Sequence, residues 1–319
     1  MHQKSMRAIA QGLNVSVMTL YRVINNAPCV SQTTRKRVIA ALDSEGILEA
    51  RSNTRSTLLI DVQDSFYRRR FAKSLLDKIG NRDYRILTSN HRKSRYHFLK
   101  MTGEADTVIF FSSPSSEIVQ AAKKENPDIF CINVSGGNDG DIIIGINNYL
   151  GGSMAAKYLY SKGHRRIAVA TTPIEPTQLD RHKGFIGEMS LLPHGKAHAL
   201  FFTNSWKRLG KSVIRLIRDK GITALFVTCD HTGFQLLHYL LNNGIRIPED
   251  LSLLSYDTPE EVVSKRPMEL DTVTFDEEQI IRLVQYYLNN RRISNSCISC
   301  HCLIAPEVKE FGSVKYLTE

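Results

Sequence analysis

The stretch from Met6 to Asn25 constrains the fold of this chain most strongly, because it has the pattern of two short helices joined by a tight turn. Apolar residues recur at the spacing of one helical face on both sides of Asn14, a residue type that tolerates the left-handed backbone of such a turn. Ser16 follows where an N-cap belongs, and its hydroxyl can accept a hydrogen bond from a free backbone N–H of the second helix. A helix-turn-helix of this kind presents its second helix to the major groove of DNA.

The residues that follow predict a third helix, which closes a small core over the first two. Ser31 is the expected N-cap of this helix, and Gly46 is its expected C-terminal stop. Val38, Ala41 and Leu42 have the spacing of an inward-facing stripe. We therefore predict a helix-turn-helix domain over residues 1–46.

The second helix carries the residues that we expect to contact DNA, on the side that faces away from the core. The candidates in this domain are Ser16, Val17, Met18, Thr19, Arg22 and Asn25. Val17, Met18 and Arg22 are the candidates for reading bases, and the other three are candidates for phosphate contact or positioning. The charge agrees with this assignment, because residues 1–60 carry half of the net charge of +10 of the whole chain.

At this point the residues resemble the DNA-binding domain of the lactose-repressor (LacI) family. The matching positions are Ala10, Val15, Ser16, Thr19, Arg22, Val23, Asn25, Val30, Ser31, Thr34, Arg35 and Val38. The resemblance implies a bacterial transcription regulator, and more closely a repressor. Its partners would then be double-stranded DNA with a pseudo-palindromic operator, a small-molecule effector, and further copies of the chain in a homodimer or a dimer of dimers.

Residues 47–57 form a polar and basic connector, in which Arg51 and Arg55 can contact phosphates. The family usually has a Pro-Asn pair and a short hinge helix here, with a leucine that wedges into the minor groove. This chain lacks the Pro-Asn pair and has Ser56 at the leucine position, and a serine cannot unstack bases. A flexible linker and a hinge helix that folds on DNA therefore stay open as alternatives.

Residues 58–319 alternate between short apolar runs and amphipathic segments, which is typical of an α/β fold with doubly wound parallel sheets. The expected strands are 58–62, 84–88, 106–111, 128–134, 141–146, 165–170, 198–202, 223–227, 251–256, 271–275 and 299–304, and the expected helices are 66–79, 96–101, 116–124, 148–162, 206–220, 233–241 and 276–288. Two successive series of this kind predict two lobes.

The segment from residue 58 to residue 319 also resembles the sensor domain of the same family, which is similar to periplasmic sugar-binding proteins. The matching stretches are Gly145 to Asn148, Gly163 to Ile167, Arg181 with Gly184 and Phe185, Ile247 to Leu251, Thr272 with Val273, and Pro306 to Val308 with Gly312 to Val314.

Polar and aromatic residues follow several of the expected strands, and open α/β sheets bind their ligands at the carboxyl ends of strands. The candidates for binding a small sugar, sugar acid or sugar phosphate between the two lobes are Phe66, Asn147, Arg181, Asp230, Asp257 and Phe275. Arginine and carboxylate side chains can each pair with two adjacent sugar hydroxyls, and an aromatic ring covers the apolar face of the sugar. The resemblance implies effector contacts for Arg181 and Asp257, whereas Asn147 stands where the family has an aspartate. Helix capping is the alternative role, above all for Asp230.

Three consecutive basic residues, Arg181, His182 and Lys183, add positive charge beside the expected effector site. An acidic ligand would follow if all three faced it, as the likeness to gluconate-type regulators of the family implies. In the alternative, which we favour, Arg181 alone faces the ligand and the other two are solvated.

Several other functions find no support in the sequence. No apolar run reaches the roughly 18 residues of a membrane span and no leader segment begins the chain, so we expect a cytoplasmic protein that does not contact a membrane. No nucleophile elbow, P-loop or zinc-protease motif is present, so we expect neither an enzyme nor a cofactor. The alternative to a regulator is a ligand-binding sensor whose atypical connector has weakened operator binding.

The segment from Cys297 to Cys302 contains the C-x-x-C-H spacing of haem attachment and of some metal sites. It falls on an expected strand, where Cys300 and Cys302 share one face and His301 lies on the other. One short strand cannot surround a tetrahedral metal ion, so we predict no metal site there.

Replacing Cys297, Cys300 and Cys302 together with serine should therefore leave DNA binding unchanged. Elemental analysis of the purified wild-type protein should find substoichiometric zinc. A tightly bound zinc ion in every chain, lost together with DNA binding in the triple variant, would contradict the prediction.

Overall fold

The computed structural model describes residues 6–24, 30–44, 56–62, 66–79, 84–112, 114–134, 139–203, 205–257, 268–290 and 300–317. The N-terminal helices are α1 (Met6–Gly12), α2 (Val17–Ile24) and α3 (Gln32–Ser44). They share a small apolar core made of Ile9, Ala10, Leu20, Val23, Val38 and Leu42. This confirms the predicted three-helix core, and we call these three helices the headpiece.

The turn between α1 and α2 has the predicted geometry. Asn14 adopts the left-handed conformation with φ of 51°. The Ser16 hydroxyl caps α2 by accepting a hydrogen bond from the backbone N–H three residues later, at 3.0 Å. Ser31 caps α3 in the same way, at 3.2 Å. A hydrogen bond of 3.0 Å from the Arg37 guanidinium to the Leu13 carbonyl oxygen ties α3 to the turn.

The chain divides into two compact units, residues 1–142 with 285–300 and residues 143–284 with 301–319. A six-stranded sheet in the order β11-β5-β4-β3-β1-β2 belongs mainly to the first unit. Its elements are β1 (Ser56–Val62), α5 (Phe66–Ile79), β2 (Tyr84–Ser89), α6 (Arg95–Thr102), β3 (Thr107–Phe111), α7 (Ser116–Glu125), β4 (Phe130–Asn133), and the strands β5 (Ile142–Ile146) and β11 (Cys300–Ile304), which cross the boundary between the units. β1 pairs in parallel with both β2 and β3, and β3 pairs in parallel with β4.

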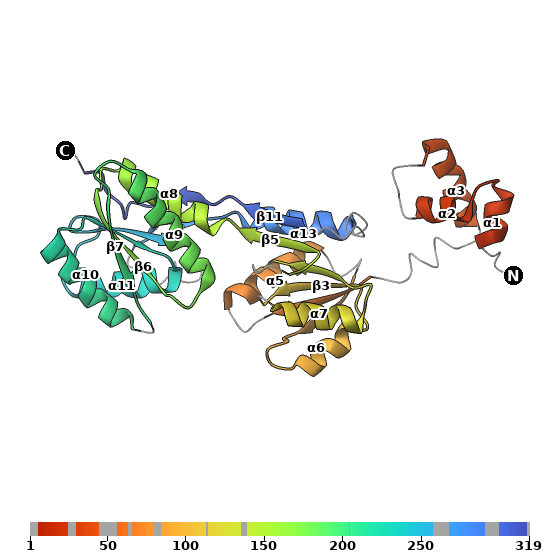
Figure 1. Ribbon diagram of the computed structural model, residues 1–319, viewed down its shortest axis with the longest axis horizontal. Helices are drawn as coiled ribbons and strands as arrows, with labels where there is room; N and C mark the ends of the chain where they lie inside the picture. The colour runs from red at the N-terminus through yellow and green to blue at the C-terminus, as the bar shows by residue number, and fades with distance from the viewer. Residues whose placement is uncertain are drawn as a thin grey trace. The chain divides into compact units, whose positions relative to one another are not determined.

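Helices cover both faces of this sheet. Phe98 of α6 and Ile118 of α7 share a buried cluster with Val108 and Phe110 of β3. Figure 1 shows α6 and α7 together on one side of β3. The next residue of β3, Phe111, meets the ring of Phe71 from α5 edge-on, with 5.3 Å between ring centroids. Because side chains alternate along a strand, α5 packs on the opposite face.

The second unit contains a six-stranded sheet in the order β12-β10-β9-β8-β6-β7. Its elements are α8 (Asn148–Ser161), β6 (Arg166–Thr171), α9 (Pro176–Leu191), β7 (Lys196–Phe201), α10 (Trp206–Lys220), β8 (Ala224–Val227), α11 (Asp230–Asn242), β9 (Ser252–Tyr256), β10 (Asp271–Thr274), β12 (Glu307–Lys309), and the helix α13 (Glu277–Asn289), which crosses into the first unit. β7, β6, β8, β9 and β10 are parallel to their neighbours, and β12 is antiparallel to β10. The predicted α/β fold with two parallel sheets is confirmed.

The strands of the second sheet are buried on both faces, as β6 illustrates. Ile167 and Val169 belong to a cluster with α8 and α9. Ala168 and Ala170 belong to a cluster with α10 and α11. This unit therefore has three layers, a sheet between two pairs of helices (Figure 1). Across the described part of the chain, no helix combines the length and the apolar character that a membrane span requires.

Of the helices and strands that the structure describes, α9 and β12 were not predicted from the sequence. The inward face of α9 contains Arg181 and Gly184 beside Phe185 and Met189. A buried arginine and a glycine interrupt the apolar spacing by which a helix is recognised. β12 has only three residues, one of which is partly buried.

The connector was predicted to extend two residues too far. β1 begins at Ser56, which pairs with Tyr84 of β2, so Ser56 and Thr57 lie in a strand. The rest of the connector, with Arg51, Arg55 and the choice between a linker and a hinge helix, lies outside the described residues.

Glycines let α8 and α9 pack closely, and this contact positions Arg181. A Cβ atom at Gly152 would overlap the carbonyl oxygen of Arg181, and a Cβ atom at Gly184 would overlap that of Tyr149. Only glycine fits at both places unless the helices separate. The backbone of α9 at Arg181 is therefore held directly against the first turns of α8.

A buried histidine anchors the C-terminal segment of the second unit. His164 is fully buried, with its Nδ1 2.8 Å from the hydroxyl of Thr223 and its Nε2 3.2 Å from the carbonyl oxygen of Lys315. A carbonyl oxygen can only accept, so Nε2 donates and Nδ1 accepts from the threonine. Burial, together with the charges of Lys315 and Arg165, lowers the pKa of His164 from 6.5 to about 4.

This pKa predicts acid sensitivity. Below pH 6.5 the unfolded chain binds a proton at His164 that the folded chain does not, so stability falls as the pH drops from about 6.5 towards 4. Replacing His164 with glutamine, whose amide can also donate and accept, should remove this dependence. The wild type should lose roughly 2 kcal/mol more unfolding free energy than the variant between about pH 7 and pH 5. Urea unfolding at both pH values measures the difference, and equal losses in the two proteins would contradict the assignment.

Candidate DNA-binding surface and effector site

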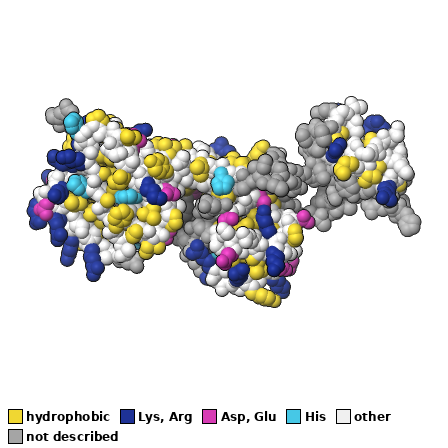
Figure 2. Space-filling model, in the orientation of Figure 1, with side chains coloured by type: hydrophobic (Ala, Val, Ile, Leu, Met, Phe, Trp, Pro, Cys, Tyr) yellow, Lys and Arg dark blue, Asp and Glu magenta, His cyan; other side chains and the backbone are white. Residues whose placement is uncertain are grey.

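The exposed side of α2 is the candidate DNA-binding surface. Met18 has 61% of its surface exposed, and Arg22, one helical turn later, is exposed beside it. Figure 2 shows Lys and Arg side chains at the surface of the headpiece. A large exposed apolar side chain next to an arginine provides both kinds of base contact, to a thymine methyl and to a guanine edge.

The structure does not place every predicted DNA contact on this surface. Val17 packs against the headpiece core, so the expectation that it faces away from the core was wrong. The reason is its place as the first residue of α2, where the chain turns over the core. Thr19 is partly buried, with its hydroxyl 2.9 Å from that of Ser16. Asn25 lies outside the described residues.

In the second unit, the predicted residues Arg181 and Asp257 meet in a buried polar cluster. Only 8% of the surface of Arg181 is exposed. Its guanidinium donates to the side-chain oxygen of Asn148 at 2.8 Å, to the carbonyl oxygen of Thr228 at 2.8 Å and to the carboxylate of Asp257 at 3.3 Å. It also lies over the ring of Tyr256, with 3.6 Å from Cζ to the ring centroid.

Strand ends bring these partners of Arg181 together. Asn148 follows β5, Thr228 follows β8 and Asp257 follows β9, so the guanidinium spans the carboxyl ends of three strands. Arg181 itself comes from the middle of α9 rather than directly after a strand, which corrects the prediction for this residue. The missed residues Asn148 and Tyr256 are the sequence neighbours of the predicted Asn147 and Asp257. This adjacency was the one available signal.

The electrostatics of the cluster are balanced. Asp257 neutralises the charge of Arg181, and burial raises the pKa of Tyr256 above its usual range, so its phenol stays neutral. A guanidinium has five N–H donors, and the three hydrogen bonds leave two of them for another acceptor. The arrangement can therefore hold a polar ligand oxygen without adding net charge.

The other four predicted effector residues lie near the ends of helices and strands. Asn147 caps α8, because its side chain accepts from the backbone N–H of Leu150 at 3.0 Å. Phe275 follows β10 and is buried, with 8% of its surface exposed. Asp230 is the first residue of α11 and Phe66 the first of α5, and the side chains of both lie outside the described part of the structure.

The two basic residues after Arg181 do not share its environment. His182 packs against Phe201, with 4.9 Å between ring centroids, and burial lowers its pKa. Lys183 is exposed and lies 3.3 Å from the carboxylate of Asp180. Of the three, only Arg181 joins the buried cluster. Lys183 is solvated, as we expected, but His182 is partly buried, so that part of the expectation was wrong.

The first unit has its own buried polar cluster, at the carboxyl ends of β1, β2 and β3. The carboxylate of Asp61 accepts from the Ser89 hydroxyl and from the His91 backbone N–H, both at 2.8 Å, and lies 2.6 Å from His91 Nδ1. Ser112 donates to the same carboxylate and lies 3.3 Å from His91 Nδ1. A hydrolase triad needs its serine at the other imidazole nitrogen, so this Ser-His-Asp group lacks that geometry.

The cysteine strand has the predicted arrangement. Cys300 and Cys302 are partly buried on one face of β11, and His301 is exposed on the other. Cys297 lies outside the described residues. Within the described ranges, no group of His, Cys, Asp and Glu side chains has the arrangement of a metal site.

Comparison with known families agrees with this geometry. Residues 5–46 match the bacterial regulatory proteins of the lacI family, and residues 156–285 match the periplasmic binding protein-like domain. Among individual relatives, catabolite control protein A of Priestia megaterium is 24% identical over 314 residues, which cover 91% of this chain and 94% of that protein. The HTH-type transcriptional repressor PurR of Aliivibrio fischeri is 25% identical over 280 residues, which cover 80% of this chain and 82% of that protein.

Solved structures share the fold. A LacI family transcriptional regulator from Enterococcus faecium with bound ribose has a TM-score of 0.65 at 20% identity, covering 82% of this chain and all of that chain. The lac repressor dimer bound to operator and the anti-inducer ONPF has a TM-score of 0.63 at 17% identity, covering 98% of this chain and all of that chain.

The fold and the headpiece thus define a helix-turn-helix protein with a periplasmic-binding-protein-like domain. A protein of this class is a regulator rather than an enzyme, as predicted. Residues 5–46 match the lacI family of bacterial regulatory proteins, and most of the chain is similar to transcriptional regulators such as catabolite control protein A.

The exposed position of Arg22 leads to a test of base reading. Replacing Arg22 with alanine should weaken binding to the preferred DNA site by about 1–3 kcal/mol if the guanidinium binds a guanine edge bidentately. Binding to random DNA should change much less. Fluorescence anisotropy with both DNAs at fixed salt measures the two losses, and equal losses would make Arg22 a phosphate contact.

Proposed function

We propose that this protein is a repressor that binds a pseudo-palindromic operator as a homodimer or a dimer of dimers and responds to a small sugar. In this proposal residues 1–46 bind DNA, the connector runs from residue 47 up to β1, and the residues from Ser56 onward bind the effector and dimerise. Ser16, Met18, Thr19, Arg22 and Asn25 are the proposed DNA contacts in the headpiece.

The observation that carries the effector part is the buried guanidinium of Arg181. It lies at the carboxyl ends of β5, β8 and β9, where open α/β sheets bind ligands. A buried arginine with two spare donors and a carboxylate beside it can donate to one sugar hydroxyl and accept from the next. One similar structure contains bound ribose and another is a complex with cellobiose, which supports the sugar class.

Local charge favours an uncharged sugar over a sugar acid or a sugar phosphate. Asp257 offsets the charge of Arg181, His182 has a lowered pKa, and Lys183 faces Asp180. The gluconate-type assignment would require an excess of positive charge at the effector site. The described residues supply no such excess.

Regulation follows from the thermodynamic linkage between effector binding and DNA binding. An effector changes DNA affinity only if it binds more tightly to one of two states of the dimer that differ in operator affinity. The effector residues Arg181 and Asp257 belong to the second unit and the DNA contacts to the headpiece. Removing an effector contact should therefore abolish the response without weakening operator binding itself.

The test replaces Arg181 with alanine. Sugar binding should weaken by roughly 2–3 kcal/mol, because a charge-assisted hydrogen bond is lost in a desolvated site. The variant should also unfold more easily, since Asp257 and the Thr228 carbonyl oxygen lose their donor. Operator affinity without sugar should be unchanged, while its dependence on sugar disappears.

Lys183→Ala is the matched control, because it removes a neighbouring positive charge of α9 that is exposed. Calorimetry with a panel of neutral sugars and sugar acids, and gel shifts with and without the sugar that binds, measure both properties. Unchanged sugar affinity in Arg181→Ala would place the effector elsewhere. A wild type that binds sugar but shows no salt-dependent binding to a palindromic site would be the ligand-binding sensor instead.

A further inference from the structure

A basic surface on the first unit belongs to neither of the sites described above. The residues from Asn90 to Gly103 include four lysines or arginines and no acidic residue. They form the turn after β2 and the helix α6. Figure 2 shows Lys and Arg side chains beside hydrophobic ones at the lower edge of this unit, where Figure 1 places α6. We define the α6 surface by its exposed residues Arg92, Lys93, Arg95, Tyr96, His97 and Lys100.

Hydrogen bonds hold the backbone of the α6 surface in a defined shape. The side-chain oxygen of Asn90 accepts from the backbone N–H groups of Arg92 at 3.1 Å and of Lys93 at 3.3 Å. Ser94 caps α6, because its hydroxyl accepts from the backbone N–H of His97 at 3.3 Å. The basic side chains therefore extend from a hydrogen-bonded turn and helix, so a partner that binds them orders little backbone.

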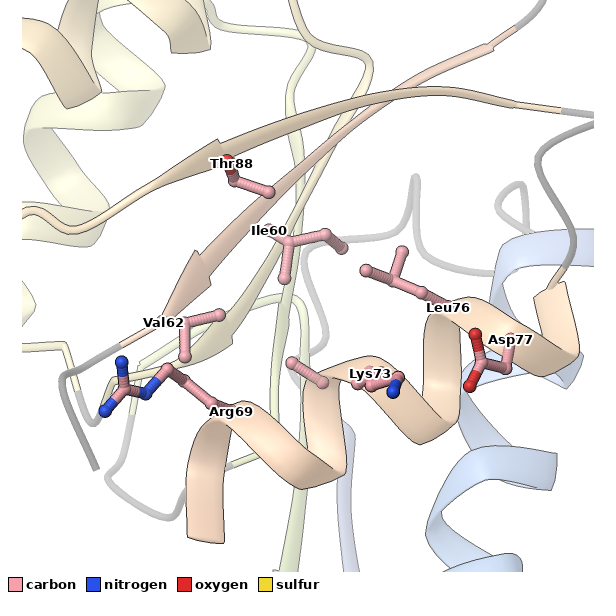
Figure 3. A pocket seen from close by; sticks show the side chains of 8 residues that line it. Ile60, Val62, Arg69, Lys73, Leu76, Asp77 and Thr88 are labelled. Carbon is pink, nitrogen blue, oxygen red and sulfur yellow. The ribbon is translucent and has the colours of Figure 1, made fainter. Parts of the chain in front are cut away.

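The positive charge of the α6 surface is not offset by its neighbours. Within the described part of the chain, no hydrogen bond or ion pair engages the side chains of Arg92, Arg95 or Lys100. Glu104, the first acidic residue after the helix, pairs with an arginine of β2 at 3.2 Å. Figure 3 shows a contrasting arrangement on α5, where the two labelled cations share their helix with the carboxylate of Asp77. The unbalanced charge of the α6 surface attracts an acidic partner.

An exposed aromatic ring lies among these cations. Tyr96 has 80% of its surface exposed, although it belongs to a helix. It lies one turn before Lys100, so the two side chains share a face of α6, and Arg95 borders that face. Tyrosine and arginine are enriched where proteins bind proteins, because each combines a large contact area with a polar group. The combination indicates a protein contact.

The shape of the α6 surface distinguishes between classes of anionic partner. Binding in a membrane requires an apolar helix face, but the apolar face of α6 packs into the core through Phe98, and Tyr96 is its one large exposed hydrophobic residue. Single-stranded nucleic acid binds in grooves where successive bases stack on several rings, whereas α6 offers one ring on a convex surface. An acidic protein segment needs only one apolar contact between its ion pairs.

We propose that the α6 surface docks an acidic segment of a partner protein. Carboxylates of the segment pair with Arg92, Arg95 and Lys100, and one apolar side chain covers the ring of Tyr96. The α6 surface shares no residue with the proposed DNA contacts or the proposed effector site. The docking proposal therefore stands or falls independently of the proposed function.

The test uses the full-length protein and a fluorescein-labelled peptide of glutamates with one central leucine. Fluorescence anisotropy at low ionic strength should show saturable binding that weakens as salt is added. Arg92→Gln/Arg95→Gln should weaken binding at least about tenfold, because two charge-assisted contacts are lost. Tyr96→Ala keeps every charge and should weaken binding at least about fivefold. All three residues are exposed, and circular dichroism verifies that each variant folds.

A second peptide, with serine in place of leucine, separates the ring contact from the charge contacts. It should bind the wild type about as weakly as the leucine peptide binds Tyr96→Ala, and Tyr96→Ala should weaken it little further. The matched control is Arg208→Gln/Arg215→Gln, which removes two exposed arginines of α10. This control should leave the affinity for the leucine peptide unchanged.

Four outcomes would overturn the proposal. The first is the absence of saturable binding of the leucine peptide. The second is equal weakening in the α10 control, which would mean general charge attraction. The third is equal weakening of both peptides by Tyr96→Ala, which would mean that the ring does not contact the leucine. The fourth is an equal loss of affinity for random single-stranded DNA in Arg92→Gln/Arg95→Gln, which would make the α6 surface a nucleic-acid contact.

Discussion

The candidate effector site depends on one ionic interaction, the contact between the buried Arg181 and the partly buried Asp257. A guanidinium that leaves water loses much solvation energy, and it is stable only when its donors are satisfied. Here the acceptors come from the ends of β5, β8 and β9, so the arginine joins three segments that are distant in the sequence. The close packing of α8 on α9 brings Asn148 within reach. Fold and site are therefore stabilised by the same contacts.

Much of the architecture could be predicted because burial leaves a periodic trace. Strands such as β6 and β8, covered on both faces, appear as continuous apolar runs, and the caps Ser16 and Ser31 precede their helices as expected. The helix α9 was missed for the same physical reason that it matters, since its inward face is interrupted by Arg181 and Gly184. A residue that serves a site breaks the pattern by which its helix is recognised.

The site itself was only partly predictable. Arg181 and Asp257 were found because the resemblance implies effector contacts for them and because polar residues near strand ends are candidates for ligand binding. Asn148 and the Thr228 carbonyl oxygen were not, since no sequence pattern distinguishes an amide or a backbone oxygen that faces a guanidinium from one that faces water. In the headpiece, the prediction for Val17 was wrong for a different reason. Its helical phase pointed outwards, but the first residue of a short helix is directed by the preceding turn.

The backbone at Asp257 limits how this protein can change. Asp257 has φ of 59°, a left-handed conformation that glycine, asparagine and aspartate adopt at the lowest cost. Glutamate and glutamine adopt this conformation at a higher cost, so Asp257 cannot readily be replaced by a longer acidic or amide side chain. Adaptation to a new ligand, in natural divergence or in the design of a biosensor, would be confined to Asn or Gly at this position. Larger changes of specificity must then begin at neighbouring residues whose backbone is unconstrained.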